Sequence, residues 1–313
     1  MVDQAKLNAL NNSMMDPSKV TFKGLIYGDP GTRKTTLGAS IGEKVLFVVA
    51  DPDGYQSLIN HPELGLGTRV ELVKYQGISQ LEFLAEVFTD GGTEYDRFDT
   101  IQLDTLSNIA SLDLDVVTRE KMKRKGDSFE WEDQQWPIYN QNTLRVRSAL
   151  LKLMLSPINV VMTAHAREKK IKQSTGVERD VTMPKFSPEI FASISGFCSL
   201  IAYMTTSEGG VDSDDTVKYK SKIQYHPTRT IVAKTRIGGL PVSEDLPDNS
   251  SDVLNGSRLR QIVEAWKQKG GALLSHEKAE EEQPEEQGIN IPVLNKNTED
   301  SDPQDETLEQ FSI

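Results

Sequence analysis

The sequence has only one cysteine, Cys198, in 313 residues. A single cysteine excludes a disulfide within the chain, and its place in the apolar run FCSLIAYM predicts a buried, reduced thiol. No apolar run is long enough for a membrane span, and the first residues, MVDQAKLNALNNSMMD, lack the basic and apolar stretches of a secretion signal. We therefore expect a cytoplasmic protein without a membrane partner.

Basic charge is also scarce, since 35 Lys and Arg residues stand against 47 Asp and Glu residues, a net charge of −12. The deficit lies at one end: residues 270–313 hold 12 acidic and 2 basic residues, a net charge of −10, which leaves −2 for the rest. This segment has too few apolar residues to form a core, so we expect a disordered acidic tail. The nearly neutral body still allows a nucleic-acid partner, because binding depends on where Lys and Arg collect.

Apolar runs alternate with helical patterns along the body of the chain. Buried strands are expected at 20–27, 45–50, 100–103 and 159–164, a weaker strand at 70–75, and helices at 78–88 and 134–155. This alternation predicts an α/β fold with a doubly wound, mostly parallel sheet. Patterns at 197–205, 217–225 and 230–234 predict an antiparallel extension, and a last helix is expected at 257–269. The predicted divisions are an N-terminal arm over 1–19, one domain over 20–269 and the tail over 270–313.

The segment GLIYGDPGTRKTTLGAS, residues 24–40, has the pattern of a strand, a turn and the start of a helix. This is the order of a phosphate-binding loop (P-loop), in which backbone N–H groups and the helix N-terminus hold phosphates. Lys34 would reach the β- and γ-phosphates of ATP, and the Thr35 hydroxyl would bind Mg²⁺. Arg33 departs from the pattern G-x-x-x-x-G-K-[ST], because it replaces the second glycine. The predicted ATP-binding residues are Gly28, Asp29, Pro30, Gly31, Thr32, Arg33, Lys34, Thr35 and Thr36.

Acidic residues follow two of the predicted strands. Asp104 ends the strand 100–103 in the form of a Walker B element, so we predict that it holds Mg²⁺ with Thr35; a simple helix-capping Asp is the alternative. Asp53 follows the strand 45–50, at the edge where open α/β sheets bind ligands. We predict that Asp53, ahead of Asp51, polarises the water that attacks the γ-phosphate; a plain turn residue is the alternative.

His165 follows the strand 159–164 and is predicted to contact the γ-phosphate, with a structural histidine as the alternative. Two basic clusters come after the strands of Asp104 and His165, and aromatic residues such as Trp131 and Trp136 lie close to the first. Positive segments with aromatic neighbours suit single-stranded DNA, although a solvated helix face gives the same pattern. The predicted DNA-binding residues are Arg119, Lys121, Lys123, Arg124, Lys125, Arg167, Lys169, Lys170 and Lys172.

Lys234 and Arg236 stand two apart at the end of a late predicted strand, in VAKTRIGGLP. Residues at i and i+2 point to the same side of a strand, so the two cations can project together. We predict that they act as a catalytic finger pair on the γ-phosphate of a neighbouring subunit, which requires a homo-oligomer.

The chain resembles the RecA-like P-loop ATPases, and more narrowly phage AAA-domain nucleotide-binding proteins, some of them associated with single-strand annealing and recombination. The matching segments cover roughly residues 20–245 and are GDPGTRKTTL, ADPDGYQSL, DTIQLDTLS, NVVMTAHAREKK and VAKTRIGGLP. The resemblance implies a catalytic acid at Asp53, a sensor at His165, DNA-binding loops at the two basic clusters, and a finger pair at Lys234 and Arg236. It also implies an oligomeric ring or filament. Asp53 is shorter than the glutamate usual in such proteins.

The leading hypothesis is an ATP-dependent protein that binds single-stranded DNA in phage-type recombination, annealing or replication and hydrolyses ATP. One alternative is an ATPase that acts on protein partners, such as a helicase loader or assembly factor. Another is a nucleotide-binding subunit with little hydrolysis. A protein partner of the acidic tail is a further expectation.

Overall fold

A computed structural model describes residues 20–51, 53–172, 178–211, 217–246 and 258–268, all of which belong to one compact unit. The predicted N-terminal arm and acidic tail lie outside the described residues.

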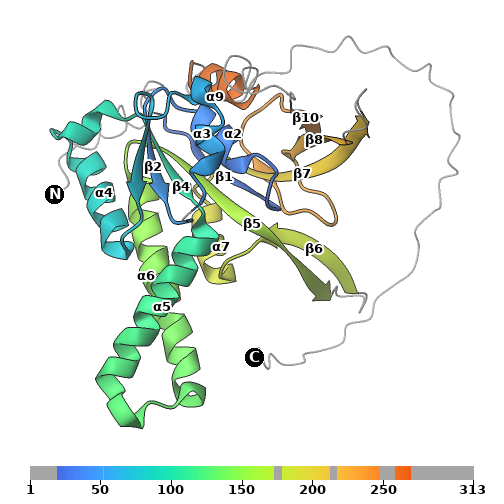
Figure 1. The fold of residues 1–313 in the computed structure, drawn as a ribbon. Helices are drawn as coiled ribbons and strands as arrows, with labels where there is room; N and C mark the ends of the chain where they lie inside the picture. The colour runs from blue at the N-terminus through green and yellow to red at the C-terminus, as the bar shows by residue number, and fades with distance from the viewer. Residues whose placement is uncertain (1–19, 52, 173–177, 212–216, 247–257, 269–313) are drawn as a thin grey trace, which may run out of the picture. The chain divides into compact units, whose positions relative to one another are not determined.

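The centre of the fold is a twisted sheet in the order β10-β8-β7-β1-β5-β4-β2-β3 (Figure 1). The strands from β7 to β3 run parallel to one another, whereas β8, β9 and β10 add antiparallel pairs beyond β7, and β6 pairs with the end of β5. The strands are β1 (Lys23–Gly28), β2 (Val45–Val49), β3 (Val70–Lys74), β4 (Thr100–Asp104), β5 (Asn159–Lys172), β6 (Glu178–Pro184), β7 (Leu200–Val211), β8 (Val217–Gln224), β9 (Lys234–Thr235) and β10 (Ser243–Asp245). The predicted α/β class, mostly parallel with an antiparallel extension, is confirmed.

Helices cover both faces of the sheet, because the parallel strands are apolar on both sides. On one face the core contains residues of α4 (Ile78–Asp90), α5 (Leu106–Lys125), α6 (Trp131–Leu155) and α7 (Pro188–Ser195). On the other face it contains residues of α2 (Lys34–Ser40), α3 (Gln56–Ile59) and α9 (Arg258–Gln268). The connections include the short 3₁₀ helices η2 (Pro62–Leu64), η3 (Glu94–Arg97) and η4 (Gly126–Ser128). The sheet is therefore doubly wound, as predicted.

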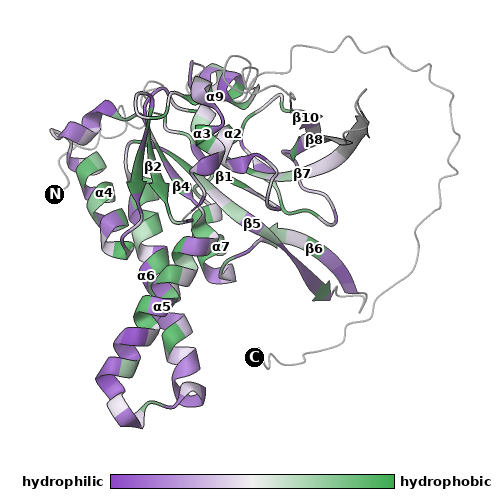
Figure 2. Cartoon of the chain, in the orientation of Figure 1, coloured by the Kyte–Doolittle hydropathy of each residue, from purple (hydrophilic) through white to green (hydrophobic). Residues whose placement is uncertain are grey.

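Three sequence-based boundaries are wrong. β5 continues to Lys172 instead of ending near Ala164. Its second half is a strand because β6 pairs with it and provides the backbone hydrogen-bond partners. The hydropathy of β5 changes from hydrophobic in the sheet to hydrophilic over most of its second half, which is why only the first half resembles a core strand (Figure 2). The strand expected at 230–234 reduces to a single bridge at Ile231 and to β9, and α6 begins at Trp131, before the expected 134.

None of the helices in the described part of the chain is long and apolar enough to cross a membrane. The helices α5 and α6 form an antiparallel pair that extends away from the sheet (Figure 1). We call residues 106–155 the α5–α6 arm.

Candidate nucleotide-binding site

A cavity of about 260 Å³ lies where the parallel strands end. It brings together residues from the turn after β1, the turn after β2, the end of β4 and β5. The lining residues are Pro30, Gly31, Arg33, Lys34, Thr35, Thr36, Asp51, Asp53, Gly54, Ser57, Asp104, Thr105 and His165. One cavity thus brings together residues predicted to bind phosphate, metal and the attacking water and to act as sensor, whereas Gly28, Asp29 and Thr32 of the predicted loop are not among its lining residues.

The loop between β1 and α2 has the backbone conformation of a tight turn around the cavity. Gly31 has φ 79°, and a Cβ built there meets nothing within 4 Å, so the loop is open at this point. Gly28 is required for a different reason, because its Cβ would lie 2.1 Å from the carbonyl oxygen of Met204 on β7. Arg33 has φ 65° and ψ 21°, which places a side chain where glycine is favoured. A residue with a Cβ therefore stands in the left-handed conformation that glycine adopts at lower cost.

Lys34 is the buried cation of the cavity. Its Nζ donates to the carbonyl oxygen of Asp29 at 2.6 Å and to Oγ1 of Thr32 at 3.2 Å. Burial lowers the pKa of Lys34, and the nearby carboxylates of Asp104 and Asp29 oppose that shift. The ammonium group is held among oxygens at the base of the loop, where it can offer its protons to a phosphate.

Thr35 and Asp104 form the candidate Mg²⁺ site. The Thr35 hydroxyl donates to Oδ2 of Asp104 at 2.8 Å, and the Thr163 hydroxyl donates to Oδ1 of the same carboxylate. Burial raises the pKa of Asp104, while these two hydrogen bonds and the charge of Lys34 favour the ionised form. A hydroxyl and a carboxylate in contact are oxygen ligands of the kind that Mg²⁺ prefers, so these residues fit the predicted ion.

The candidate catalytic residues Asp51, Asp53 and His165 also line the cavity. Oδ1 of Asp51 accepts a hydrogen bond from the backbone N–H of Asp53 at 3.2 Å. Oδ1 of Asp53 accepts one from Nε2 of Gln56 at 3.0 Å. His165 lies beside Gly28 in the parallel register of β1 and β5. Burial lowers the pKa of His165, as do the charges of Lys34 and Lys185. A neutral imidazole at this point can donate or accept one hydrogen bond per ring nitrogen.

Neighbouring residues hold α2 at both of its ends. Gln102 on β4 donates from Nε2 to the carbonyl oxygen of Thr35 at 3.1 Å. Arg69 donates from Nη1 and Nη2 to the carbonyl oxygen of Ala39, at 2.9 and 2.6 Å, in the last turn of α2. A cation at the C-terminal end of a helix satisfies carbonyls that lack helical partners and stabilises the helix dipole.

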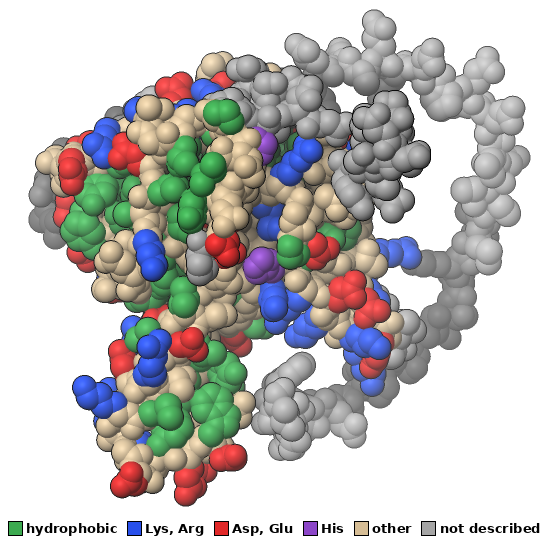
Figure 3. All heavy atoms as spheres, viewed as in Figure 1, with side chains coloured by type: hydrophobic (Ala, Val, Ile, Leu, Met, Phe, Trp, Pro, Cys, Tyr) green, Lys and Arg blue, Asp and Glu red, His purple; other side chains and the backbone are tan. Residues whose placement is uncertain are grey.

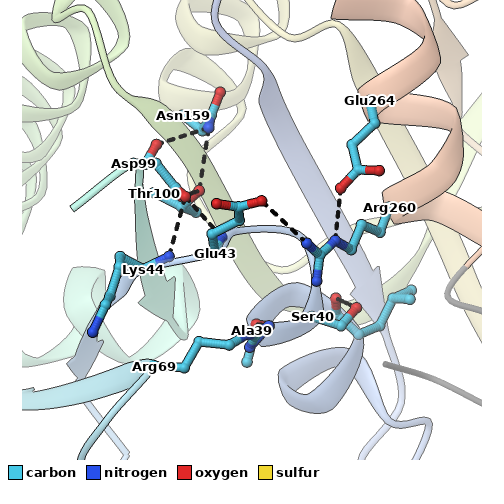
Figure 4. Close-up of polar contacts among 11 residues, drawn as sticks. Ala39, Ser40, Glu43, Lys44, Arg69, Asp99, Thr100, Asn159, Arg260 and Glu264 are labelled. Carbon is cyan, nitrogen blue, oxygen red and sulfur yellow. Dashed lines mark hydrogen bonds and ion pairs between the residues drawn. The ribbon is translucent and has the colours of Figure 1, made fainter. Parts of the chain in front are cut away.

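Polar contacts hold the turn that leaves α2 (Figure 4). This turn precedes β2, at the opposite end of the sheet from the cavity. Asp99 accepts the backbone N–H groups of Glu43 and Lys44 at 2.7 and 3.1 Å. Arg260 of α9 forms ion pairs with Glu43 at 3.6 Å and with Glu264 at 2.7 Å (Figure 4). The phosphate-binding helix is thereby fixed to the body of the protein at its far end.

The two basic clusters occupy different places. Residues 119–125 form the last turns of α5, a helix of 20 residues that starts beside the cavity, so they lie about 20–30 Å along the helix from Asp104. This cluster therefore lies away from the nucleotide edge of the sheet. The second cluster belongs to the extended part of β5, which leads directly out of the cavity from His165. It forms a strand rather than the expected loop.

Lys234 of β9 pairs with Ile201 near the start of β7, and Arg236 follows β9, at the end of the sheet away from the cavity. Nζ of Lys234 donates to the carbonyl oxygen of Ser195 at 2.5 Å, and Nη2 of Arg236 donates to that of Gly196 at 2.6 Å. The two cations do project together, as predicted, and within the protomer they bind the C-terminal end of α7.

Sequence reasoning missed Thr163 and Gln102 as site residues. Both are fully buried polar residues in otherwise apolar strands, NVVMTA and TIQLD. A buried hydroxyl or amide in such a run must find a hydrogen-bond partner, and this was the available signal.

A parallel α/β sheet, a P-loop at the end of one strand and a Thr–Asp pair beside its lysine define a P-loop nucleotide-binding protein. The family model described as AAA domain matches residues 21–237, more than half of the chain, and the chain belongs to this family. Its domain is thus of the nucleotide-binding ATPase type, for which Mg²⁺ is the typical ion. No curated protein matches the chain at a significant level.

Proposed function

We propose that the protein binds ATP with Mg²⁺ and hydrolyses it in response to single-stranded DNA. The observation that carries the ATP part is the contact of Thr35 with Asp104 beside the buried Lys34, inside one cavity. Lys34 and the loop amides would hold the phosphates, and Thr35 and Asp104 would hold the ion, which supplies positive charge to the γ-phosphate as the bond to it breaks.

For hydrolysis we propose Asp53 as the residue that orients and polarises the attacking water. Its carboxylate lines the cavity, is exposed, and uses one oxygen to bind Gln56, which leaves the other oxygen for water. His165, from the neighbouring side of the cavity, would contact the γ-phosphate. We expect the Asp53→Asn variant to keep its nucleotide affinity and to lose most of its ATP hydrolysis.

For DNA we propose one face of the hairpin formed by β5 and β6. Side chains two apart on a strand share a face, so Arg167 and Lys169 extend the line that starts at His165 in the cavity. Arg179 of β6 stands opposite Ile171 and belongs to the same face. On the other face Lys170 and Lys172 stand opposite Asp180 and Glu178, so their charge is balanced across the strands. The unbalanced positive face is the one suited to a nucleic-acid backbone.

This proposal separates the sequence-predicted cluster into two halves and adds Arg179. The positive face begins at His165, the candidate γ-phosphate contact. Bound DNA and bound nucleotide would therefore both contact β5. We infer from this a DNA-dependent ATPase, and we place it in recombination, annealing or replication of single strands.

The experiment is an ATPase assay with and without single-stranded DNA. We expect DNA to stimulate hydrolysis in the parent, and the Arg167→Gln/Lys169→Gln/Arg179→Gln variant to lose that stimulation while ATP affinity stays normal. The matched control is Lys170→Gln/Lys172→Gln, which should bind DNA almost as the parent does. The salt dependence of binding should flatten only in the first variant, because fewer counterions are released.

An ATPase rate that DNA leaves unchanged would favour action on protein partners. No measurable hydrolysis, with ATP still bound, would favour a nucleotide-binding subunit. Equal DNA affinity in both variants would remove the hairpin face from the proposal.

A further inference from the structure

The inner half of the α5–α6 arm has a core, but its outer half has none. Arg145 of α6 forms ion pairs with Asp113 and Glu120 of α5, both at 3.1 Å, and Val117 and Ile138 are fully buried. Beyond that point the burial stops: no residue from 118 to 137 is buried. Helices in proteins depend on packing for most of their stability, so a pair of helical ends without a buried side chain is incomplete in isolation.

The outer half also exposes large apolar side chains. Trp136 is 77% exposed, Met122 48% and Trp131 39%. Hydrophobic side chains gather on the visible face of the arm, with acidic side chains at its tip (Figure 3). An apolar patch at the end of a projecting element, rimmed by charge, is typical of a surface that another macromolecule covers.

The charges of the outer half are balanced in number and separated in place. Five basic residues, Arg119, Lys121, Lys123, Arg124 and Lys125, lie at the end of α5. Four acidic residues follow in η4, at the N-cap of α6 and in its first turn, namely Asp127, Glu130, Glu132 and Asp133. The fifth, Glu120, lies among the basic residues and pairs with Arg145. Within the described part of the chain, none of the five basic residues forms an ion pair.

The acidic residues beside this basic cluster oppose the approach of a nucleic-acid backbone, whose binding depends on a local excess of positive charge. A surface with a basic half and an acidic half is instead complementary to its own copy. In a two-fold contact, the end of α5 in each protomer meets the start of α6 in the other, and every attraction occurs twice.

We propose that the outer half of the α5–α6 arm, residues 118–137, is a self-association surface that binds the same surface of a second copy. The tryptophans Trp131 and Trp136 form the apolar centre of this contact and the charges form its rim. The contact is isologous and joins two protomers. It is separate from the ring or filament contact that Lys234 and Arg236 would need, and it stands independently of the proposed ATPase activity.

The test is a charge exchange in the full chain, followed by sedimentation at several concentrations. Arg124→Glu/Lys125→Glu and Glu132→Lys/Asp133→Lys should each raise the dissociation constant of the dimer by about tenfold or more, because each replaces attraction by repulsion. An equimolar mixture of the two variants should restore the dimer, and so should one chain that carries all four substitutions. The matched control is Asp90→Lys/Glu94→Lys, which makes the same change in charge at exposed residues away from the arm.

A second readout uses fluorescence. Two of the three tryptophans, Trp131 and Trp136, lie in the outer arm, while Trp266 is buried in the α9 core. Dilution of the parent should therefore shift tryptophan emission to longer wavelength as the dimer separates, and Trp136→Ser should weaken both the shift and the dimer.

The proposal is overturned if the parent stays monomeric across the accessible concentrations, or if the two reversed variants associate as the parent does. It is also overturned if Lys123→Gln/Arg124→Gln/Lys125→Gln lowers DNA affinity while association is unchanged, because the arm would then be a nucleic-acid surface. Circular dichroism and ATP affinity check that each variant is folded.

Discussion

Gln102 and Thr35 meet where β4 passes beneath α2, and the amide of Gln102 donates to the carbonyl oxygen of Thr35 at 3.1 Å. Two residues further along β4, Asp104 accepts the hydroxyl of the same threonine. Gly38 makes room for this arrangement, since a Cβ there would lie 2.7 Å from Nε2 of Gln102. One strand therefore holds both oxygens of the candidate metal-binding threonine.

We expect Gln102→Leu to weaken Mg²⁺-dependent ATP binding more than Mg²⁺-independent binding. The substitution removes the side-chain hydrogen bond to the Thr35 carbonyl and costs about 0.5–1.5 kcal/mol. Nucleotide titrations with Mg²⁺ and with a chelator measure the difference. Gln102→Asn, which keeps the amide on a shorter side chain, should retain part of the metal dependence. An equal loss in both titrations would mean a purely structural role.

We expect Lys34→Ala to abolish nucleotide binding, because it removes the buried cation of the P-loop. Thr35→Ala should weaken chiefly the Mg²⁺-dependent part. Equilibrium titration with a fluorescent ATP analogue measures both. If Lys34→Ala bound ATP as tightly as the parent, the phosphates would have to lie outside the cavity.

Arg33 provides a test of backbone strain. We expect Arg33→Gly to be more stable to unfolding than Arg33→Ala by about 1 kcal/mol, since glycine adopts positive φ without the cost that a Cβ brings. Both variants lack the arginine side chain, so the comparison isolates the backbone. Chemical denaturation measures it, and equal midpoints with equal slopes would show that φ at this residue carries no strain.

Lys23 predicts a pH dependence of stability. Its Nζ donates to the carbonyl oxygens of Ser156 and Ile158, at 2.8 and 2.5 Å, and burial lowers its pKa to about 7. The unfolded chain, with a lysine pKa of 10.5, binds more protons between these values, so this residue's contribution to stability rises as pH increases from 7 to 10.5. A neutral amine still has two N–H groups for the two carbonyls.

Lys23→Met should remove this contribution. The free energy of unfolding should be measured for both proteins at pH 7 and pH 9. Relative to the variant, the parent should be more stable at pH 9 than at pH 7. A pH-independent difference would mean that Lys23 keeps its charge when folded.

For Lys234 and Arg236 we expect single alanine variants to lower ATPase activity while ATP affinity stays near normal. Mixing Arg236→Ala subunits with Lys34→Ala subunits should restore part of the activity, because intact cations then face intact P-loops. No recovery in a verified mixed oligomer would leave only the contacts of these residues with the end of α7.

Local patterns were sufficient to predict the parallel sheet, its helices and the P-loop, because each depends on short-range spacing of apolar and glycine residues. The pairing of β5 with β6 was not predictable in this way. The charged strand REKKIK lacks the alternation of a half-buried strand, and its partner ERDVTMP also begins with three charged residues. The roles of Gln102 and Arg69 also depend on contacts between segments distant in the sequence.

The place of the 119–125 cluster shows the same limit. Its helix was expected from the sequence, but the direction of that helix is set by packing of Val117 and Ile138 and by the ion pairs of Arg145, which no local pattern reveals.

The arm begins at the cavity wall itself. Thr105, which caps α5 and accepts the N–H of Asn108, lines the cavity, and Ser107 accepts the N–H of His165. From there α5 runs unbroken for 20 residues, about 30 Å. A rotation of the helix axis by about ten degrees about Thr105 would move the far end of α5 by about 5 Å. A small displacement of Thr105 at the cavity wall would thus move the tip of the arm by about the length of one helical turn.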